Sequence, residues 1–303
     1  MRVFLTGGSG FVGSAALDEL LERGHEVTAL VHRSEIERDG VTSITGGLFG
    51  ADLADAVAGH DVVIHLVGII EEHGDRTFEK MHLEGTQRIV DASIAAGVSR
   101  YVHMSALGSR ADAVSEYHKT KWAAEMYIRK QAEALRWTIF RPSLIHGPQG
   151  EFTRQLAAWS KGTAAPWFFM PYFGAGLIGT GHKYRVAPVF IDDVAKVFVD
   201  AAETHEVAGK IYNVCGTERL TWPEMHRTAS AAILGKPKRV IPVPAWYAKL
   251  VARITPASWI PFNLAQVQMS QEDNTGDITE LCSDFGFRPR PFTASFQAYA
   301  PTL

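Results

Sequence analysis

The sequence is poor in cysteine and has no strong excess of charge of either sign. Its 303 residues include only two cysteines, Cys215 and Cys282, which lie too far apart for a zinc-binding motif and fit a reducing compartment. The 30 Lys and Arg residues nearly balance the 33 Asp and Glu residues, and the net charge is −3. Binding to nucleic acid generally needs a marked basic excess, so we expect no nucleic-acid partner.

Long apolar runs and targeting signals are also missing. Residues 164–180 form the longest charge-free apolar stretch, but two prolines and three glycines make it a poor membrane-spanning helix. No positively charged segment followed by an apolar stretch precedes residues 2–6, so we expect no secretory signal. We therefore expect a cytoplasmic protein, and contact with the periphery of a membrane stays open.

Glycine is instead concentrated at one point, directly after the first apolar run. Residues 3–5 (VFL) predict a buried strand, residues 11–23 have the apolar spacing of a helix, and residues 26–31 predict a second strand. Gly7, Gly10 and Gly13 therefore lie in the turn between a strand and a helix. A glycine motif in this setting is typical of a site for a nicotinamide dinucleotide.

Each glycine of this turn has its own predicted task. Gly7 allows the tight turn, Gly10 leaves room for a pyrophosphate, and Gly13 lets the helix approach the strand. The free amides and positive dipole end of the helix attract the phosphates. The residues that we expect to bind the cofactor here are Gly7, Ser9, Gly10, Phe11, Val12 and Gly13.

The end of the second strand bears on the choice between the two nicotinamide cofactors. Sites that prefer NAD(H) usually have Asp or Glu at this place, where the carboxylate binds the ribose hydroxyls. Here the residues are His32 and Arg33, and a guanidinium is a good partner for a 2′-phosphate. We therefore expect NADP(H) to be preferred, with NAD(H) as the alternative.

Strand and helix patterns alternate through the first half of the chain. Segments 61–68, 100–105 and 137–140 predict buried strands, 78–96 and 116–133 predict helices, and a short strand is expected near 41–45. This alternation predicts an α/β fold with a doubly wound parallel sheet, which binds ligand beyond the carboxyl ends of its strands. Residues 1–147, with returning segments near 186–216, are the predicted dinucleotide-binding domain. Residues 148–303 are mainly the predicted substrate-binding region.

A tyrosine and a lysine on one predicted helix carry the candidate chemistry. Tyr117 and Lys121 are four residues apart and share a helix face. A nearby lysine favours the phenolate and lowers the pKa of the tyrosine, which then exchanges a proton with a substrate while hydride moves to or from nicotinamide. The lysine also suits a hydrogen bond to the nicotinamide ribose. Ser105, at a predicted strand end, is expected to position the substrate oxygen.

Taken together, these motifs resemble the extended branch of the short-chain dehydrogenase/reductase superfamily. Within that branch the chain is similar to the group related to the NAD(P)H-binding accessory subunit of respiratory complex I. The resemblance covers most of the chain and is carried by TGGSGFVG (6–13), 62–68, HLEGT (82–86), YVHMSALG (101–108), 117–121, IFRPSLIHG (139–147), VFIDDV (189–194), GKIYNVCG (209–216) and LTWPE (220–224).

The resemblance implies further cofactor contacts as well as a fold. It implies a Rossmann core followed by a C-terminal substrate-binding region. The residues implied beside the nicotinamide are Pro142, Ser143 and Leu144, and those implied on the adenosine side are Leu66, Val67 and Gly68.

The chain departs from the family pattern at the catalytic serine. The family register puts Ala106 in the usual Ser or Thr place, with Ser105 one residue early and Ser109 as a substitute. Two classes of function therefore stay open. One is an NAD(P)-dependent oxidoreductase, or an epimerase or dehydratase, acting on a small carbonyl or hydroxyl compound such as a lipophilic molecule or a nucleotide sugar. The other is a non-catalytic NADPH-binding protein in assembly or regulation of a respiratory or quinone-related complex.

An aromatic run at 167–173 (WFFMPYF) falls in the predicted substrate region. We expect it to line a pocket for a lipophilic substrate or to touch a membrane surface. Proteins of the superfamily often pair helices into dimers, so a monomer or a homodimer is expected.

Four histidines lie near predicted strand or helix ends: His65, His82, His103 and His146. Their spacing to Cys and carboxylate residues does not suggest a metal shell. We expect them to be hydrogen-bonded structural residues, and His146 is in addition a weak candidate for substrate contact.

Overall fold

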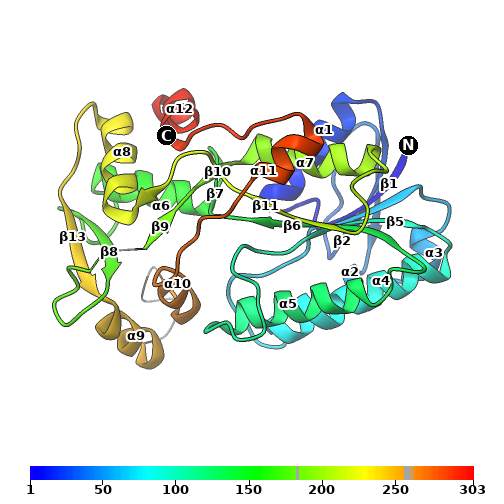
Figure 1. Cartoon of the computed structure of the whole chain (residues 1–303), viewed down its shortest axis with the longest axis horizontal. Coiled ribbons are helices and arrows are strands. Elements are labelled where there is room, and N and C mark those ends of the chain that lie inside the picture. Colours follow the sequence, from blue (N-terminus) through cyan, green and yellow to red (C-terminus); the bar gives the residue numbers. More distant parts are fainter. Residues whose placement is uncertain (182–183, 256–259, 261) are drawn as a thin grey trace. The chain divides into compact units, whose positions relative to one another are not determined.

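The computed structural model describes residues 1–181, 184–255, 260 and 262–303 (Figure 1). The chain forms two compact units. The first comprises Met1–Pro142, Ile191–Asn213 and Ile278–Phe287, and the second comprises Ser143–Phe190, Val214–Asp277 and Arg288–Leu303. Because the chain passes between the units several times, neither unit is one continuous segment.

The first unit is built on a seven-stranded sheet with the order β11-β6-β5-β4-β1-β2-β3. The pairings of β1 to β6 within it are all parallel. Its strands are β1 (Arg2–Thr6), β2 (Glu26–Val31), β3 (Val41–Thr45), β4 (Val62–His65), β5 (Arg100–Met104), β6 (Arg136–Pro142) and β11 (Lys210–Val214). The order reverses at β1, between β2 and β4, as in doubly wound nucleotide-binding sheets. The predicted fold class is confirmed.

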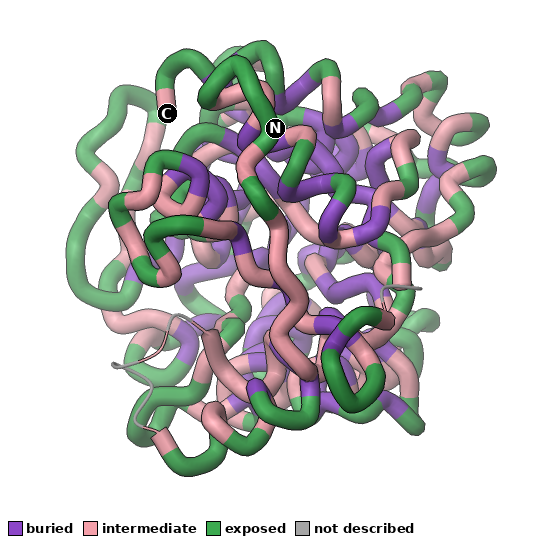
Figure 2. Tube along the Cα trace, turned by 90° about the vertical axis from the view of Figure 1, so that its left-hand side faces the viewer, coloured by how far each residue is buried: buried purple, intermediate pink, exposed green. Residues whose placement is uncertain are grey.

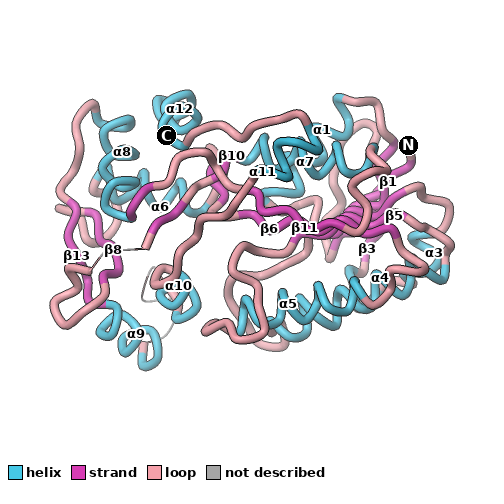
Figure 3. The backbone as a smooth tube through the Cα atoms, viewed as in Figure 1, coloured by secondary structure: helices cyan, strands magenta, loops and turns pink. Residues whose placement is uncertain are grey.

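Helices cover both faces of this sheet, as Figure 3 shows. On one face lie α4 (Gly85–Ala95) and α5 (Glu116–Arg129), and on the other lie α1 (Phe11–Glu22), α7 (Ile191–Glu203) and α11 (Thr279–Phe285). Short helices α2 (Gly47–Gly50) and α3 (Leu53–Val57) follow β3. The helix predicted at 78–96 begins with a π-helical segment, η1 (Glu79–Glu84), and the one predicted at 116–133 ends earlier, at Arg129.

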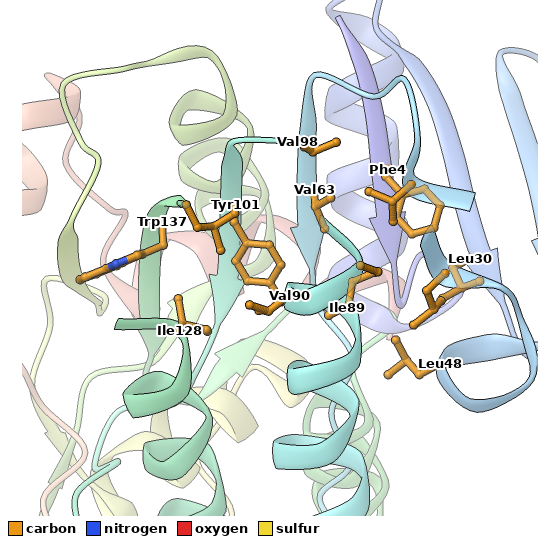
Figure 4. Packing of buried hydrophobic residues seen from close by; sticks show 14 of the residues in the cluster. Phe4, Leu30, Leu48, Val63, Ile89, Val90, Val98, Tyr101, Ile128 and Trp137 are labelled. Carbon is orange, nitrogen blue, oxygen red and sulfur yellow. The ribbon is translucent and has the colours of Figure 1, made fainter. Parts of the chain in front are cut away.

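One layer of the core of the first unit lies between the sheet and the helices α4 and α5 (Figure 4). Ile89 and Val90 of α4 and Ile128 of α5 point towards strand residues such as Tyr101 and Val63. These side chains are completely or almost completely buried. Burying one large apolar side chain contributes about 1.5–3 kcal/mol to the free energy of unfolding. This layer therefore holds the strand ends in a defined place.

The second unit is made of short strand pairs and helices. Its strands pair as β7 (Ile145–His146) with β10 (Val189–Phe190), β8 (Met170–Gly174) with β13 (Val240–Pro244), and β9 (Arg185–Val186) with β12 (Leu220–Thr221). Its helices are α6 (Glu151–Lys161), α8 (Trp222–Leu234), α9 (Ala245–Ile254), α10 (Leu264–Met269), α12 (Phe292–Tyr299) and the 3₁₀ helix η3 (Ala300–Thr302). Among the described residues, none of the helices in the chain is both long and apolar enough to cross a membrane.

The aromatic run at 167–173 divides into two parts. Met170 and Tyr172 of β8 are buried, because alternate residues of this strand face the interior. Trp167 and Phe168 precede the strand and are 58% and 84% exposed. Figure 2 shows buried and exposed residues along the described chain, with exposed stretches mostly on the outside. The run is therefore not one continuous apolar surface.

Candidate functional site

The glycine turn after β1 has a backbone that only glycine suits. Gly7 adopts φ +79°, and its carbonyl oxygen accepts a hydrogen bond from the Gly10 amide at 3.0 Å. A Cβ atom on Gly13 would lie 2.0 Å from the Gly7 oxygen. The helix α1 therefore approaches the turn as closely as an α-carbon without a side chain allows, as the sequence predicted.

The N-terminus of α1 opens at this turn. Gly10 is the N-cap residue, and no side chain caps the helix there. Ser9 and Gly10 are exposed and Phe11 is half-buried, whereas the Val12 side chain is buried in the core. Amides without a side-chain cap at a helix N-terminus suit an anionic group such as a pyrophosphate. Val12 thus offers a ligand its backbone rather than its side chain.

The loop after β4 runs directly beside the glycine turn. A Cβ atom on Gly7 would lie 3.1 Å from the carbonyl carbon of Leu66 and from the amide nitrogen of Val67. A Cβ atom on Gly68 would lie 2.9 Å from Lys121 Nζ. The structure therefore brings together the glycine turn, the β4 loop and Lys121 at the carboxyl ends of the parallel strands.

Two buried histidines fix this edge of the sheet. His65 Nδ1 lies 2.7 Å from Thr6 Oγ1, and His65 Nε2 lies 3.3 Å from Thr86 Oγ1. His82 links α5 to the β4 loop, since its Nδ1 lies 3.0 Å from Thr120 Oγ1 and its Nε2 lies 3.0 Å from the Ile69 oxygen. Burial lowers the pKa of His65 to about 3 and that of His82 to about 2, so both are neutral.

The prediction of hydrogen-bonded histidines is confirmed for three of the four. His146 Nδ1 lies 2.9 Å from the Tyr299 hydroxyl in the second unit. For His103 the prediction is wrong, because the residue is buried and neither ring nitrogen has a hydrogen-bond partner among the described residues. Its ring stacks on His65 at 5.4 Å instead.

Lys121 is almost completely buried, and its ammonium group is held by the backbone. Its Nζ donates a hydrogen bond to the Met104 oxygen at 3.0 Å, at the end of β5. Burial lowers the pKa of Lys121 to about 8, and the charge of Glu125 acts in the opposite direction. A buried ammonium group of this kind is a strong hydrogen-bond donor, and its contact with a ribose stays a prediction.

Tyr117 lies one helical turn before Lys121, among aromatic rings. The ring centroids of Phe78, His82 and His118 lie 5.8, 5.2 and 5.3 Å from its own, all edge-on. Burial raises the pKa of Tyr117 to about 12. The predicted lowering of this pKa by Lys121 is therefore wrong for the protein without ligand, because desolvation of the phenolate is the dominant effect.

Ser105 follows β5, and its hydroxyl belongs to a buried polar group. It donates a hydrogen bond to Glu125 Oε1, and the hydroxyls of Ser105 and Ser109 lie 3.2 Å apart. Glu125 is 1% exposed and accepts a hydrogen bond from Arg141 Nε at 2.8 Å. Glu125 was not predicted as a site residue, although it lies four residues after Lys121 and so on the same face of α5.

The remaining predicted cofactor residues lie in different surroundings. His32 and Arg33 follow β2 and are exposed. Pro142 ends β6, and its oxygen accepts a hydrogen bond from the Leu107 amide at 2.9 Å. Ser143 and Leu144 open the second unit, where the Ser143 hydroxyl donates to the Ala187 oxygen and the Leu144 amide donates to Asn274 Oδ1 at 2.9 Å. Their contact with a nicotinamide stays a prediction.

The second unit contains an open pocket of its own. Its volume is about 580 Å³, and it is lined by Thr180, Gly181, Arg185, Thr221, Pro223, Glu224 and Arg227. Glu224 forms a capping box with Thr221 at the start of α8, so its carboxylate is already hydrogen-bonded. Two guanidinium groups in one pocket suit a ligand with a carboxylate or phosphate group. No group of three or more metal-ligating side chains occurs in the part of the chain that the structure describes.

The sheet order and the glycine turn define a dinucleotide-binding Rossmann domain. The residues fit a dinucleotide, because the glycine turn keeps side chains away from the N-terminus of α1, where no side-chain cap competes with a phosphate for the amides. The family model described as NAD(P)H-binding matches residues 7–164, which is more than half of the chain. The chain belongs to this NAD(P)H-binding family, and its cofactor is a nicotinamide dinucleotide.

Curated relatives agree with the extended short-chain dehydrogenase group. The chain is 30% identical to the 2-alkyl-3-oxoalkanoate reductase of Stenotrophomonas maltophilia, over 78% of this chain and 77% of that protein. It is 26% identical to mitochondrial subunit 9 of the NADH dehydrogenase (ubiquinone) 1 alpha subcomplex of Dictyostelium discoideum. That match covers 72% of this chain and 60% of the length of the subunit.

A solved structure supports the fold of the whole chain. The structure described as MoeE5 in complex with UDP-glucuronic acid and NAD has a TM-score of 0.76 and 20% sequence identity. The similarity covers 98% of this chain and 97% of that one. At this identity the comparison shows the fold and does not extend to the substrate.

Proposed function

We propose that the protein is an NADP(H)-dependent reductase of a carbonyl compound with a lipophilic part and an acidic group. The observation that carries the proposal is the position of Lys121, whose ammonium group lies between the end of β5 and Gly68, beside the glycine turn. Tyr117 precedes it by one turn of the same helix. A Tyr–Lys pair at the carboxyl edge of a dinucleotide-binding sheet suits proton transfer coupled to hydride transfer.

The residues of the chain have separate tasks in this reaction. A dinucleotide held by the glycine turn and Lys121 would supply the hydride for the carbonyl carbon. Tyr117, whose pKa burial raises to about 12, carries its proton at neutral pH and donates it to the substrate oxygen. Lys121, whose Nζ already donates to the Met104 oxygen, would donate a further hydrogen bond to the ribose. A protonated tyrosine favours the direction of reduction over oxidation.

The hydroxyl of Ser105 is not available as a hydrogen-bond donor to a substrate. Because its proton goes to Glu125, Ser105 can only accept a hydrogen bond from a ligand. The adjacent Ser109 is also buried and lies 3.2 Å from the Ser105 hydroxyl, so a bond from Ser109 to a substrate oxygen would replace its bond to Ser105. We therefore assign Ser105 to the positioning of this loop.

The preference for NADP(H) rests on the end of β2. Arg33 is exposed there, and neither His32 nor Arg33 repels a 2′-phosphate as a carboxylate would. We expect Arg33→Asp to weaken NADPH binding at least tenfold and to improve NADH binding, because the charge that faces the 2′-position is reversed. Dissociation constants for both cofactors, measured by fluorescence titration, test this, with Arg38→Asp as the control. Equal affinities of the native protein for NADPH and NADH would contradict the preference.

Two features support the substrate class. The reductase of Stenotrophomonas maltophilia, named for a 2-alkyl-3-oxoalkanoate, is similar over most of this chain. Arg185 and Arg227 in the pocket of the second unit offer two cations to an acidic group. A nucleotide sugar also carries anionic groups, so paired assays with 3-oxoalkanoates and with nucleotide sugars separate these classes. Both cysteines are free, which agrees with the reducing cytoplasm expected for such an enzyme.

Substitution of Tyr117 tests the proposed chemistry directly. Tyr117→Phe removes the proton donor, and we expect the reduction rate to fall by a factor of about 10²–10⁴ while NADPH still binds. Tyr127→Phe on the same helix is the control, since its hydroxyl contacts Asp91 at the surface. Turnover that is equal in native protein and Tyr117→Phe would contradict the assignment.

A non-catalytic role is the second candidate, and the hydrogen bond from Ser105 to Glu125 favours it. With Ala106 in the usual hydroxyl position, the substrate oxygen has fewer donors than in active enzymes of the superfamily. The similarity to a Dictyostelium protein named as a subunit of an NADH dehydrogenase (ubiquinone) subcomplex also supports a role within a larger assembly. Tight NADPH binding without turnover of any carbonyl compound would favour this candidate.

A further inference from the structure

Helix α9 carries its large apolar side chains on the outside. Its outward residues are Trp246, Tyr247, Leu250 and Ile254, which are about half-exposed or more, and Ile254 reaches 74%. Its inward residues, Ala245 and Ala248, are small and pack near Val267 of α10. A helix at a water-facing surface normally has the opposite arrangement. Figure 1 shows α9 at the edge of the second unit, next to the β8–β13 pair.

A neighbouring loop tip extends this apolar surface. Leu177 and Ile178, in the loop after β8, are 81% and 70% exposed. The Trp246 Nε1 atom donates a hydrogen bond to the Leu177 oxygen at 3.0 Å, which joins the loop tip to α9. We call Leu177, Ile178, Trp246, Tyr247, Leu250 and Ile254 together the α9 patch.

The charged side chains of α9 itself have one sign. Lys249 and Arg253 are the charged residues of α9, and no Asp or Glu occurs between Glu224 and Glu272 or between Glu151 and Asp192. The second unit as a whole has 13 Lys and Arg against 6 Asp and Glu, a net charge of +7. The first unit has 17 against 27, a net charge of −10. The total of −3 therefore conceals a strongly basic unit.

We propose that the α9 patch docks on an anionic phospholipid bilayer, with α9 lying in the plane of the interface. Exposed Trp and Tyr side chains favour the boundary between headgroups and acyl chains, and leucine and isoleucine enter the acyl region. Lys249 and Arg253 flank these residues and match the lipid phosphates in charge. This inference does not depend on the chemistry proposed above.

A second copy of the chain is a poorer occupant of the same face. A two-fold symmetric contact would bring Lys249 and Arg253 close to their own copies. The long segments without Asp or Glu leave few carboxylates to compensate this repulsion. On an anionic membrane surface this repulsion does not arise, because Lys249 and Arg253 then face lipid phosphates of opposite charge.

The exposed aromatic residues before β8 provide an internal control. Trp167 and Phe168 are as exposed as the α9 patch but precede β8, whereas α9 and the Leu177 loop follow β13 and β8. Because β8 and β13 run parallel, the two sets lie beyond opposite ends of these strands. The Trp246–Leu177 hydrogen bond joins the loop tip to α9 and makes one patch of six large apolar residues. Lys238 Nζ beside Trp167 is already hydrogen-bonded to the oxygens of Trp159 and Trp167. We therefore assign membrane contact to the α9 patch rather than to Trp167 and Phe168.

Vesicle flotation with the full chain tests the proposal. Vesicles of phosphatidylcholine alone are compared with vesicles that also contain phosphatidylglycerol, at low and at high salt. The variants are Trp246→Ser with Leu250→Ser for the apolar part, and Lys249→Gln with Arg253→Gln for the charge. Trp167→Ser with Phe168→Ser is the matched control. Cofactor titration and the thermal midpoint of each variant show whether it folds.

We expect the native protein and the control to float with anionic vesicles at low salt, with less flotation at high salt or without phosphatidylglycerol. Both α9 variants are expected to remain unbound while still folded. Absence of flotation of the native protein, or equal flotation of native protein and folded α9 variants, would overturn the proposal. A native dimer that the α9 variants convert to monomer, without vesicle binding, would also overturn it and identify the face as a contact between copies.

Discussion

At the scale of single residues, Lys121 shows how one buried cation serves the proposed function at a cost in stability. Its ammonium group has a backbone acceptor and lies at the ligand edge of the sheet, but it is 2% exposed. Removing a charged group from water is unfavourable, which is why burial lowers its pKa to about 8 from an ordinary value of 10.5. A residue kept for packing alone would not need this charge.

The lowered pKa of Lys121 predicts a pH-dependent stability. Between pH 8 and 10.5 the unfolded chain binds a proton that the folded chain has lost, so the native free energy of unfolding rises with pH in this window. Lys121→Met lacks this gain. We expect its free energy of unfolding, relative to native protein, to fall by about 3 kcal/mol from pH 8 to 10.5.

Urea unfolding of both proteins at several pH values measures this difference. Lys119→Met is the control on the same helix, because the Lys119 side chain is 42% exposed and pairs with Glu116 at the surface. Its difference from native protein is expected to stay constant across the window. A constant difference for Lys121→Met as well would show that Lys121 keeps its ordinary pKa in the folded protein.

At the scale of elements, the contact of α1 with the β1 turn sets the geometry of the cofactor site. α1 has no side-chain N-cap, and its first turn begins where the glycine turn ends. Its stability therefore comes from packing, through buried residues such as Ala16, Leu17 and Leu20, rather than from capping. The same packing forces the close approach that only Gly13 permits.

Gly13→Ala is the sharpest test of this element. The added Cβ atom would lie 2.0 Å from the Gly7 oxygen, so either α1 or the turn must move. We expect a loss of stability of about 1–3 kcal/mol and a loss of dinucleotide binding, because the amides of α1 are displaced from the phosphates. Gly50→Ala, with open space around the new atom, is the control and should change stability by less than about 0.5 kcal/mol. Normal cofactor affinity in a folded Gly13→Ala protein would refute this account of the turn.

At the scale of the whole molecule, each unit is assembled from segments that lie far apart in the sequence. The first unit takes α7, β11 and α11 from sequence positions after residue 190. Helix α7 buries Val194, Val197 and Phe198, and the ring of Phe198 lies 4.7 Å from that of Phe140 in β6. A fragment that ends near residue 147 therefore leaves one face of the sheet partly uncovered.

We expect the isolated fragment 1–147 not to fold cooperatively, because it lacks α7 and the edge strand β11. Circular dichroism during heating and the spread of amide NMR signals measure this. A chain in which a flexible linker joins residues 1–142 to 191–213 is the matched comparison and should regain a thermal transition. A cooperative transition in 1–147 itself would show that the returning segments are dispensable.

Much of the first unit could be predicted from the sequence, because its signals are local. Strand β3 spans the predicted residues 41–45, and the α1 helix lies within one residue of its prediction. Apolar runs and turn residues determine such elements with little help from distant contacts. The glycine turn was likewise predictable, since a positive φ and a close approach leave no alternative to glycine.

Other features depended on contacts between distant residues, which local patterns do not encode. Burial by distant parts of the chain underlies three of these features. They are the hydrogen bond of Ser105 to Glu125, the His103 ring nitrogens without partners among the described residues, and the raised pKa of Tyr117. The aromatic run at 167–173 looked continuous in sequence, yet strand pairing buried Met170 and Tyr172 and left Trp167 and Phe168 outside.

The sequence by itself thus determined the class of fold and the cofactor, since both rest on short motifs whose backbone geometry allows few residues. Only the tertiary structure decided which groups are buried and which large apolar side chains face outward. Burial depends on what packs over a residue from elsewhere in the chain. That information decided the protonation of Tyr117 and Lys121, and it distinguished the α9 patch from the other apolar residues of the second unit.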